Sequence, residues 1–235
     1  MQGRAGGKAP KGETSGPQLV PILMIGKGRV FLPGPNGPVV ARSEGGAPID
    51  LLDVADRLAE KYTRVYVVDL DGLRDDKAQL DYLQELSRDL ELWVDAGIRT
   101  GDQAIDILVA GATRAVLSTA YLRGRRELQR AWKLSQELAF EIELRDQRVA
   151  GSDEEWTGTD PAGVAAAVRE IGVAEIILSP RERAVDWGLV ATLAKDGSVW
   201  VDGTFEETET AQLASSRASG GFFHLHQFLG VTVES

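Results

Sequence analysis

Residues 64–118 read RVYVVDLDGLRDDKAQLDYLQELSRDLELWVDAGIRTGDQAIDILVAGATRAVLS, and this stretch decides the fold class. Runs rich in β-branched and apolar residues alternate there with amphipathic segments, at 64–69, 79–88, 92–95, 101–110 and 114–118. Such an order forms a parallel sheet, because a crossover long enough to hold a helix returns the chain to the same edge. The stretch therefore predicts an α/β domain.

The same alternation continues outward in both directions and predicts eight strand–helix units. Strands are expected at 21–25, 64–69, 92–95, 114–118, 140–144, 175–179, 198–202 and 221–225. Helices are expected at 51–61, 79–88, 101–110, 125–138, 161–171, 187–195 and 208–217. Eight units fit a single closed (β/α)8 TIM barrel, which typically takes roughly 250 residues. An open doubly wound sheet is the alternative, although no G-x-G-x-x-G motif follows the first strand.

We expect the barrel to span residues 19–235, with a flexible N-terminal tail at 1–18. The tail is rich in Gly, Pro, Ser and Lys, so it buries too little apolar surface to offset its ordering entropy. Two pairs of segments also predict a half-barrel internal repeat. The tripeptide WVD at 93–95 recurs at 200–202, and IGKGRV at 25–30 resembles LRDQRV at 144–149.

The composition excludes several classes of function. The 235 residues carry a formal net charge of −10, whereas nonspecific nucleic-acid binding needs a basic surface. There is no cysteine, which excludes disulfides and Cys-ligated metals. His224 and His226 have one acid nearby, too few ligands for a metal, and we expect no cofactor. Without a signal segment or an apolar run of roughly 18 residues, we expect a cytoplasmic protein that avoids membranes.

Carboxylates end four of the predicted strands, at Asp69, Asp95, Glu143 and Asp202. Active sites of such barrels lie at the C-terminal ends of the strands, where a ring of acids can supply a general acid and a general base. Glu143, Asp69 and Asp202 are therefore the catalytic candidates. The alternative is that strand-end aspartates cap the helices that follow them.

Small and hydroxyl-bearing residues follow three of the strands. Gly97 and its counterpart Gly203 would let backbone amides approach a phosphate, assisted by the N-terminus of the next helix. Ser118 and Thr119 would add hydroxyl and amide donors. These four residues are the candidates for binding phosphate, although a glycine in a βα turn is also an ordinary turn residue.

Several motifs resemble those of the histidine-biosynthesis barrels, the ribotide isomerase and the cyclase subunit of imidazole glycerol phosphate synthase. They are VVDLDG at 67–72, DAGIRT at 95–100, AGA at 110–112, VLSTA at 116–120 and PILMI at 21–25 with Gly28. The similarity covers nearly all of residues 20–235 and is most specific in the second to fourth strands. It implies a barrel enzyme that rearranges or cyclises an aminoaldose phosphate.

The resemblance also assigns residues, and here the sequence departs from the family. Acid–base aspartates on strands one and five correspond to Met24 and Glu143, and Met24 cannot exchange a proton. The family's glycines after strand seven and on strand eight correspond to Gly203-Thr204 and, approximately, Leu225. We therefore expect the family's own isomerisation to be lost, since removing one acid–base group typically costs on the order of 10²–10⁴ in rate.

Two functions follow from these patterns. The first is an isomerase-like or lyase-like enzyme that acts on a small phosphorylated metabolite. The second is a non-catalytic barrel that binds a ligand or joins a complex, with a link to cofactor biosynthesis. The chain stops where the family has its last helix, so a truncated last helix would expose Phe222, Phe228 and Leu229. An exposed apolar patch usually marks an interface, which predicts a homodimer or a subunit of a complex.

Overall fold

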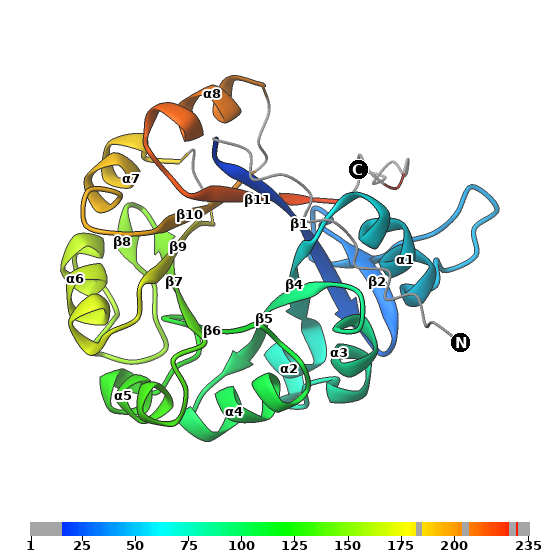
Figure 1. Cartoon of the computed structure of the whole chain (residues 1–235), viewed down its shortest axis with the longest axis horizontal. Coiled ribbons are helices and arrows are strands. Elements are labelled where there is room, and N and C mark those ends of the chain that lie inside the picture. The colour runs from blue at the N-terminus through cyan, green and yellow to red at the C-terminus, as the bar shows by residue number, and fades with distance from the viewer. Residues whose placement is uncertain (1–15, 182–184, 204–206, 226–228, 230–235) are drawn as a thin grey trace, which may run out of the picture.

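The computed structural model describes residues 16–181, 185–203, 207–225 and 229. In this part of the chain, eight parallel strands form the wall of a barrel (Figure 1). They are β1 (Gln18–Gly26), β4 (Arg64–Asp69), β5 (Glu91–Ile98), β6 (Arg114–Ser118), β7 (Leu138–Arg145), β9 (Glu175–Pro180), β10 (Val199–Asp202) and β11 (Gly220–His224).

The barrel is closed by its first and last strands. β1 pairs in parallel with β11, from Gln18 opposite Gly220 to Ile22 opposite His224. This pairing confirms the predicted (β/α)8 TIM barrel and excludes the open doubly wound sheet. The first strand begins at Gln18, one residue before the predicted domain boundary, and residues 1–15 of the predicted tail lie outside the described residues.

Helices surround the barrel wall (Figure 1). They are α1 (Leu51–Lys61), α2 (Leu70–Asp75), α3 (Leu80–Leu86), α4 (Gly101–Val109), α5 (Gly124–Leu134), α6 (Pro161–Ile171), α7 (Trp187–Leu193) and α8 (Glu207–Ser215). The predicted limits of α1 and α6 are confirmed at both ends. Asp50 and Asp160 cap these two helices through their side chains, which explains why both begin where the sequence indicates. None of the described helices is long and apolar enough to cross a membrane.

Short antiparallel strands extend the barrel at its C-terminal end. β2 (Arg29–Leu32) folds back on β1 and pairs with β3 (Val39–Val40), and β8 (Arg148–Val149) folds back on β7. The turns that join β1 to β2 and β7 to β8 each contain two residues with positive φ. The angles are 49° and 67° at Lys27-Gly28, and 50° and 63° at Asp146-Gln147. The similar segments 25–30 and 144–149 thus form equivalent hairpins after the first and fifth barrel strands, which supports the half-barrel repeat.

Two apolar layers make up the core. Val67 and Val94 lie in the layer between the barrel and its helices, and Val116 and Ile177 lie inside the barrel, all as predicted. Large aromatic rings fill the interior next to them. Trp93 and Trp200, the repeated tryptophans, meet with ring centroids 4.8 Å apart, and Phe222 stacks on Trp200 at 5.5 Å.

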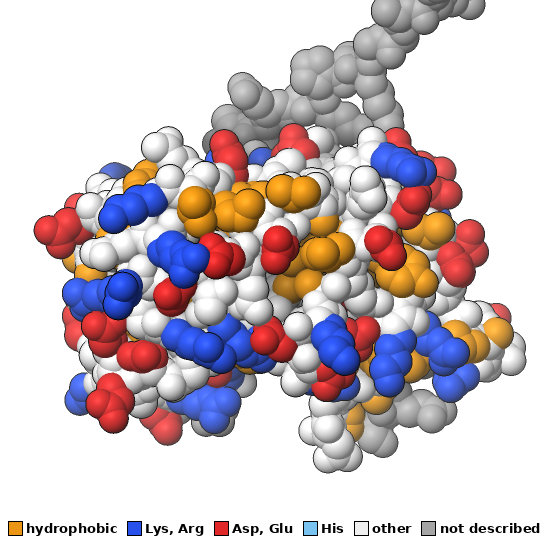
Figure 2. All heavy atoms as spheres, turned by 90° about the horizontal axis from the view of Figure 1, so that it is seen from below, with side chains coloured by type: hydrophobic (Ala, Val, Ile, Leu, Met, Phe, Trp, Pro, Cys, Tyr) orange, Lys and Arg blue, Asp and Glu red, His pale blue; other side chains and the backbone are white. Residues whose placement is uncertain are grey.

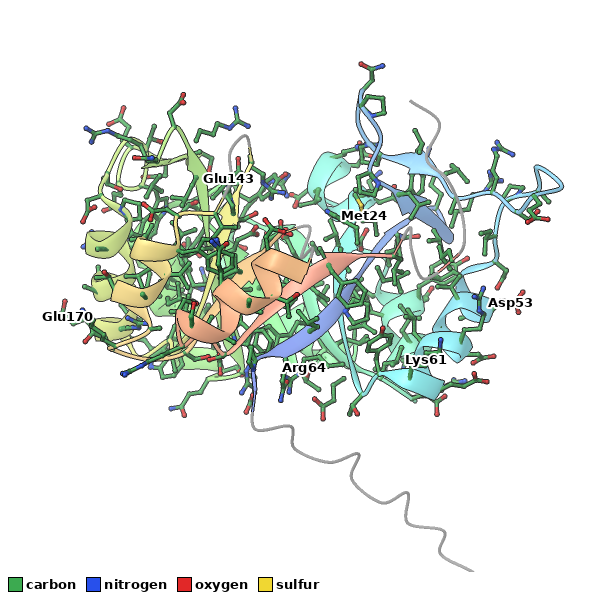
Figure 3. The ribbon with its side chains drawn as sticks, turned by 90° about the horizontal axis from the view of Figure 1, so that it is seen from above. Met24, Asp53, Lys61, Arg64, Glu143 and Glu170 are labelled. Atoms are coloured by element: carbon green, nitrogen blue, oxygen red, sulfur yellow. The ribbon has the colours of Figure 1, made fainter. Side chains whose placement is uncertain are left out.

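This packing corrects one expectation about the last strand. Phe222 is fully buried inside the barrel and is therefore not part of an exposed patch. The predicted truncation of the last helix, together with Phe228, lies outside the described residues. Leu229 is half-buried against the outer core layer. Arg64 lies at the opposite end of the barrel from Met24 and Glu143 (Figure 3). Its guanidinium is 5.1 Å from the centroid of the Trp93 ring and covers that end of the barrel interior.

Candidate active site at the barrel mouth

A cavity of about 480 Å³ opens at the C-terminal ends of the barrel strands. Its wall along β1, β4 and the adjoining helix α2 is mostly apolar and includes Ile22, Met24, Val68, Leu70 and Leu73. The opposite wall is charged and comprises Asp95, Glu141, Glu143, Arg145, Arg181 and Asp202. The volume lies in the ordinary range for a small-molecule site. A ligand here would meet one apolar and one ionised surface.

Arg181, directly after β9, is the centre of the charged wall. Its guanidinium contacts Glu143 Oε2 at 3.2 Å, Glu141 Oε1 at 3.3 Å and Asp202 Oδ2 at 3.9 Å. These carboxylates raise the pKa of Arg181 above its ordinary value, although burial acts against them. Arg145 contacts the other oxygen of Glu143, Oε1, at 3.4 Å. Glu143 is therefore held between two arginines.

Two carboxyl groups of this wall titrate near neutral pH. Burial raises the pKa of Glu141 to about 7, with Asp95 and Asp202 adding to the rise and Arg181 opposing it. Burial also raises the pKa of Asp95 to about 6, although its Oδ1 accepts a hydrogen bond from the Gly97 amide at 3.0 Å. Groups that are partly protonated at pH 7 can either donate or accept a proton, so the wall can perform acid–base chemistry.

Two of the predicted catalytic residues face this cavity. Glu143 is buried on β7, and Asp202 ends β10 and accepts a hydrogen bond from the Ser179 hydroxyl at 3.0 Å. Met24 lies on β1 across the opening from Glu143 (Figure 3). The structure thus places a thioether where the resemblance implies the partner acid.

Asp69 does not line the cavity, and its carboxylate is occupied by structural hydrogen bonds. Oδ1 accepts from the amides of Asp71 and Gly72, and Oδ2 accepts from the amide of Gln79 at 2.6 Å. Asp69 therefore caps α2 and ties the chain before α3 to the strand end. This is the capping alternative described above, and the catalytic role of Asp69 has no supporting contact with the cavity.

The candidate phosphate residues Gly97, Ser118 and Thr119 lie at the ends of the neighbouring strands β5 and β6, but their polar groups have partners. The Gly97 amide donates to Asp95, and the Ser118 hydroxyl accepts from the Ala120 amide at 3.1 Å. The Thr119 hydroxyl donates to Ala150 O at 2.7 Å, and its amide donates to Glu141 O at 3.0 Å. None of the three lines the cavity.

The helix N-termini beside these residues are also occupied, by carboxylates of the chain itself. Glu127 Oε2 accepts from the Gly101 amide in the first turn of α4 at 2.8 Å. Glu155 Oε2 accepts from the Arg125 amide in the first turn of α5 at 2.6 Å. Both glutamates stand where an external anion would otherwise bind the positive end of the helix. The binding of phosphate at Gly97, Ser118 and Thr119 stays a prediction.

The second predicted phosphate position is described only in part. Gly203 follows β10, and its amide donates to Phe222 O at 3.2 Å. Thr204 and His226 lie outside the described residues. Among the residues that the structure describes, no group of three His, Asp or Glu side chains could hold a metal ion.

Three members of the charged wall, Glu141, Arg145 and Arg181, were not among the predicted site residues. Glu141 had a signal, because alternation along a strand places residues 141 and 143 on the same face. Arg181 and Arg145 had no comparable signal, since an arginine after a strand is usually a solvated side chain. Asp95 was part of the predicted acid ring, although it was not assigned a catalytic role.

Comparisons with known proteins agree with this architecture. The family model described as "Histidine biosynthesis protein" matches residues 36–183, well over half of the chain. A comparison with curated proteins gave no match. The matched part runs from before β3 to just beyond β9 and includes Glu143, Arg181 and most of the cavity wall. The family match and the closed eight-stranded barrel together show that this chain belongs to the histidine-biosynthesis barrel family.

Proposed function

We propose that the chain is an isomerase-like or lyase-like enzyme that binds a small phosphorylated metabolite at the barrel mouth and moves protons on it. The family binds phosphorylated sugar-like metabolites in general. The observation that carries the proposal is the Arg181 cluster, in which one guanidinium bridges Glu141, Glu143 and Asp202 inside a cavity. Such a cluster holds acids in fixed positions, as proton transfer requires.

In this proposal Glu143 is the general base. Its two oxygens lie beside Arg145 and Arg181, and these ion pairs hold the carboxylate at the cavity, where it can accept a proton from the substrate. Asp95, with a pKa of about 6, is partly protonated near neutral pH and would return a proton to the developing oxyanion. Asp202 faces the same cavity and anchors Arg181, so it is the second candidate for this step.

We assign the anionic end of the substrate to Arg145 and Arg181. Their side chains are 61% and 42% exposed, so both can turn part of the guanidinium towards a ligand at the rim. Guanidinium groups bind phosphate oxygens through paired hydrogen bonds. The amides of the neighbouring strand ends are already engaged, which favours the arginines as the phosphate-binding groups.

Exchange of substrate protons with solvent tests the enzymatic proposal. The protein would be incubated with ribose 5-phosphate, ribulose 5-phosphate or ribose in deuterated buffer, and the protons beside the carbonyl followed by NMR. We expect exchange with a phosphorylated sugar, and Glu143→Gln should slow it by about 10²–10⁴. Glu170→Gln is the control, because Glu170 lies on the outside of the barrel (Figure 3).

The same experiment distinguishes the alternative, a non-catalytic ligand-binding barrel. Met24 in place of the strand-one acid and the occupied helix N-termini favour that function. Phosphorylated sugars that bind without any exchange would contradict catalysis and support the alternative. Exchange that persists in Glu143→Gln would contradict the role of Glu143.

We also propose that two copies of the chain associate.

A further inference from the structure

We propose that Glu141 is the deep recognition group of the cavity and that its Oε2 accepts a hydrogen bond from an amino group of the ligand. The substrate would then be a small amino compound with a phosphate at its other end. The phosphate end rests on the function proposed above, whereas the amino end follows from contacts of Glu141 itself.

Glu141 has one satisfied and one unsatisfied carboxylate oxygen. Oε1 accepts a hydrogen bond from Arg181 at 3.3 Å, and Oε2 has no hydrogen-bond partner among the described residues. The Ser179 hydroxyl also lowers the pKa of Glu141, but its hydrogen bond goes to Asp202 Oδ2 at 3.0 Å. The side chain is 3% exposed, so water does not cover the free oxygen as it would at the surface. A buried acceptor without a partner is rare and unfavourable, which indicates that a ligand supplies the missing donor.

The charges around Glu141 favour a cationic donor. Asp95 reaches it from β5 and Asp202 from β10, and both interact with it unfavourably. Arg181 contacts Glu141 and Asp202 and interacts favourably with Asp95, and it also contacts Glu143. Tyr66 from β4 is kept neutral, because burial and Glu141 raise its pKa well above the ordinary value. An ammonium group at Oε2 would offset this excess of negative charge.

The position of Glu141 along β7 defines the length of the ligand. Glu141 lies two residues deeper in the barrel than Glu143 and four residues deeper than Arg145. A strand rises about 3.3 Å per residue, so the α-carbons of Arg145 and Glu141 are about 13 Å apart. Both side chains extend into the cavity and shorten that span. A chain of about five carbons between amino and phosphate groups fits the remaining distance.

Four matched probes separate the two ends of the ligand. Pentyl phosphate and 5-aminopentyl phosphate form the phosphorylated pair, and pentan-1-ol and 5-aminopentan-1-ol form the unphosphorylated pair. Dissociation constants would be measured by NMR titration at pH 8, where Glu141 is mostly ionised. We expect the amino compound to bind about 10-fold tighter or more within a pair, as for a hydrogen bond to a charged group.

Variants then assign each contribution to a residue. Glu141→Leu should reduce the amino preference to within about 2-fold, and Glu141→Gln, which keeps the shape of the side chain, should reduce it clearly. Arg145→Gln should weaken binding of the phosphorylated pair and leave the amino preference unchanged. Glu170→Gln should change neither.

Each outcome bears on one proposal. Absence of an amino preference in both pairs of the wild-type protein overturns the inference, as does a preference that survives in both Glu141 variants. An amino preference without any gain from phosphate supports the role of Glu141 and contradicts the phosphate site at Arg145. A gain from phosphate without an amino preference supports the phosphate site at Arg145 and contradicts the role of Glu141.

Discussion

Glu141 couples the stability of the barrel to pH. Its pKa rises from 4.5 to about 7 on folding, chiefly through burial, so the folded state binds the proton more tightly than the unfolded state. Between these pH values unfolding releases a proton, and the wild-type protein loses stability as pH rises. Glu141→Gln has no such proton. Its free energy of unfolding, relative to wild type, should increase by on the order of 2–3 kcal/mol from pH 5 to pH 8.

Urea unfolding of both proteins at pH 5 and pH 8 measures this difference. The comparison largely cancels the other titrating groups, because they are common to both proteins. A difference that stays constant with pH would show that Glu141 is not buried in its ionisable form.

Position 97 requires a glycine, for backbone and steric reasons that the sequence indicated only indirectly. Its φ angle is +65°, and a β-carbon there would lie 2.9 Å from Leu73 Cα. Gly158 has a similar φ of +73° with no atom within 4 Å of the added carbon, so it is a matched control. Gly158→Ala should cost about 1 kcal/mol of unfolding free energy from the backbone alone. Gly97→Ala should cost at least about 1 kcal/mol more, because α2 must move.

Chemical denaturation of the two alanine variants tests this reasoning. Equal losses would mean that α2 yields to the new methyl group without strain. Gly97 was predicted as a phosphate position, and its closeness to Leu73 could not be foreseen because α2 was not predicted. Glu143 and Asp202 could be placed at the barrel mouth from the sequence because strand ends are readable, whereas the hydrogen bond that Asp69 accepts from the amide of Gln79, ten residues away, could not be predicted.

The elements themselves were largely predictable, for local reasons. Strands that alternate with amphipathic segments give a parallel barrel, and caps such as Asp50 fix where helices begin. α2 was missed because its six residues directly follow β4, too short for a periodic pattern. The hairpin after β7 was missed because its turn, Asp146-Gln147, lacks the Asn-Gly or Asp-Gly signature of such turns.

The first turn of α5 shows how an element can exclude a ligand. Glu155 accepts a hydrogen bond from the Arg125 amide and thereby occupies the anion-binding end of the helix. Glu155→Ala should lower the free energy of unfolding by about 1 kcal/mol. It should also open the helix terminus, so that inorganic phosphate raises the melting temperature of the variant more than that of the wild-type protein.

Thermal melts with phosphate, and with chloride at the same ionic strength, test this prediction. Glu154→Ala removes a neighbouring exposed charge and is the matched control. If phosphate stabilises all three proteins equally, the terminus of α5 does not bind anions even when it is vacant.

The face of the molecule shown in Figure 2 carries charges of both signs, and apolar side chains lie in small groups among them. The closed barrel follows from the repeated strand–helix pattern, and its closure could be predicted because eight units complete the wall. The set of residues that lines the cavity could not be predicted, because it depends on which strand ends meet across the mouth of the barrel. Arg181 contacts residues of β7, at least 38 positions earlier in the chain, and Asp202 of β10, 21 positions later. Sequence spacing alone does not reveal that these residues meet.

The predicted homodimer would form through the outer face of β1 and β11. Leu19 is 39% exposed on that wall, and Phe223 is half-buried against Tyr62, with ring centroids 5.9 Å apart. We expect light scattering at micromolar concentration to give about twice the chain mass of 25.4 kDa. Leu19→Glu should shift the protein to monomers, because a buried charge without a partner is strongly unfavourable at an interface. Val109→Glu is the control, since Val109 is 80% exposed on α4, away from this wall. A wild-type monomer under these conditions would contradict the prediction, and a dimer that both variants retain would place the interface on another face.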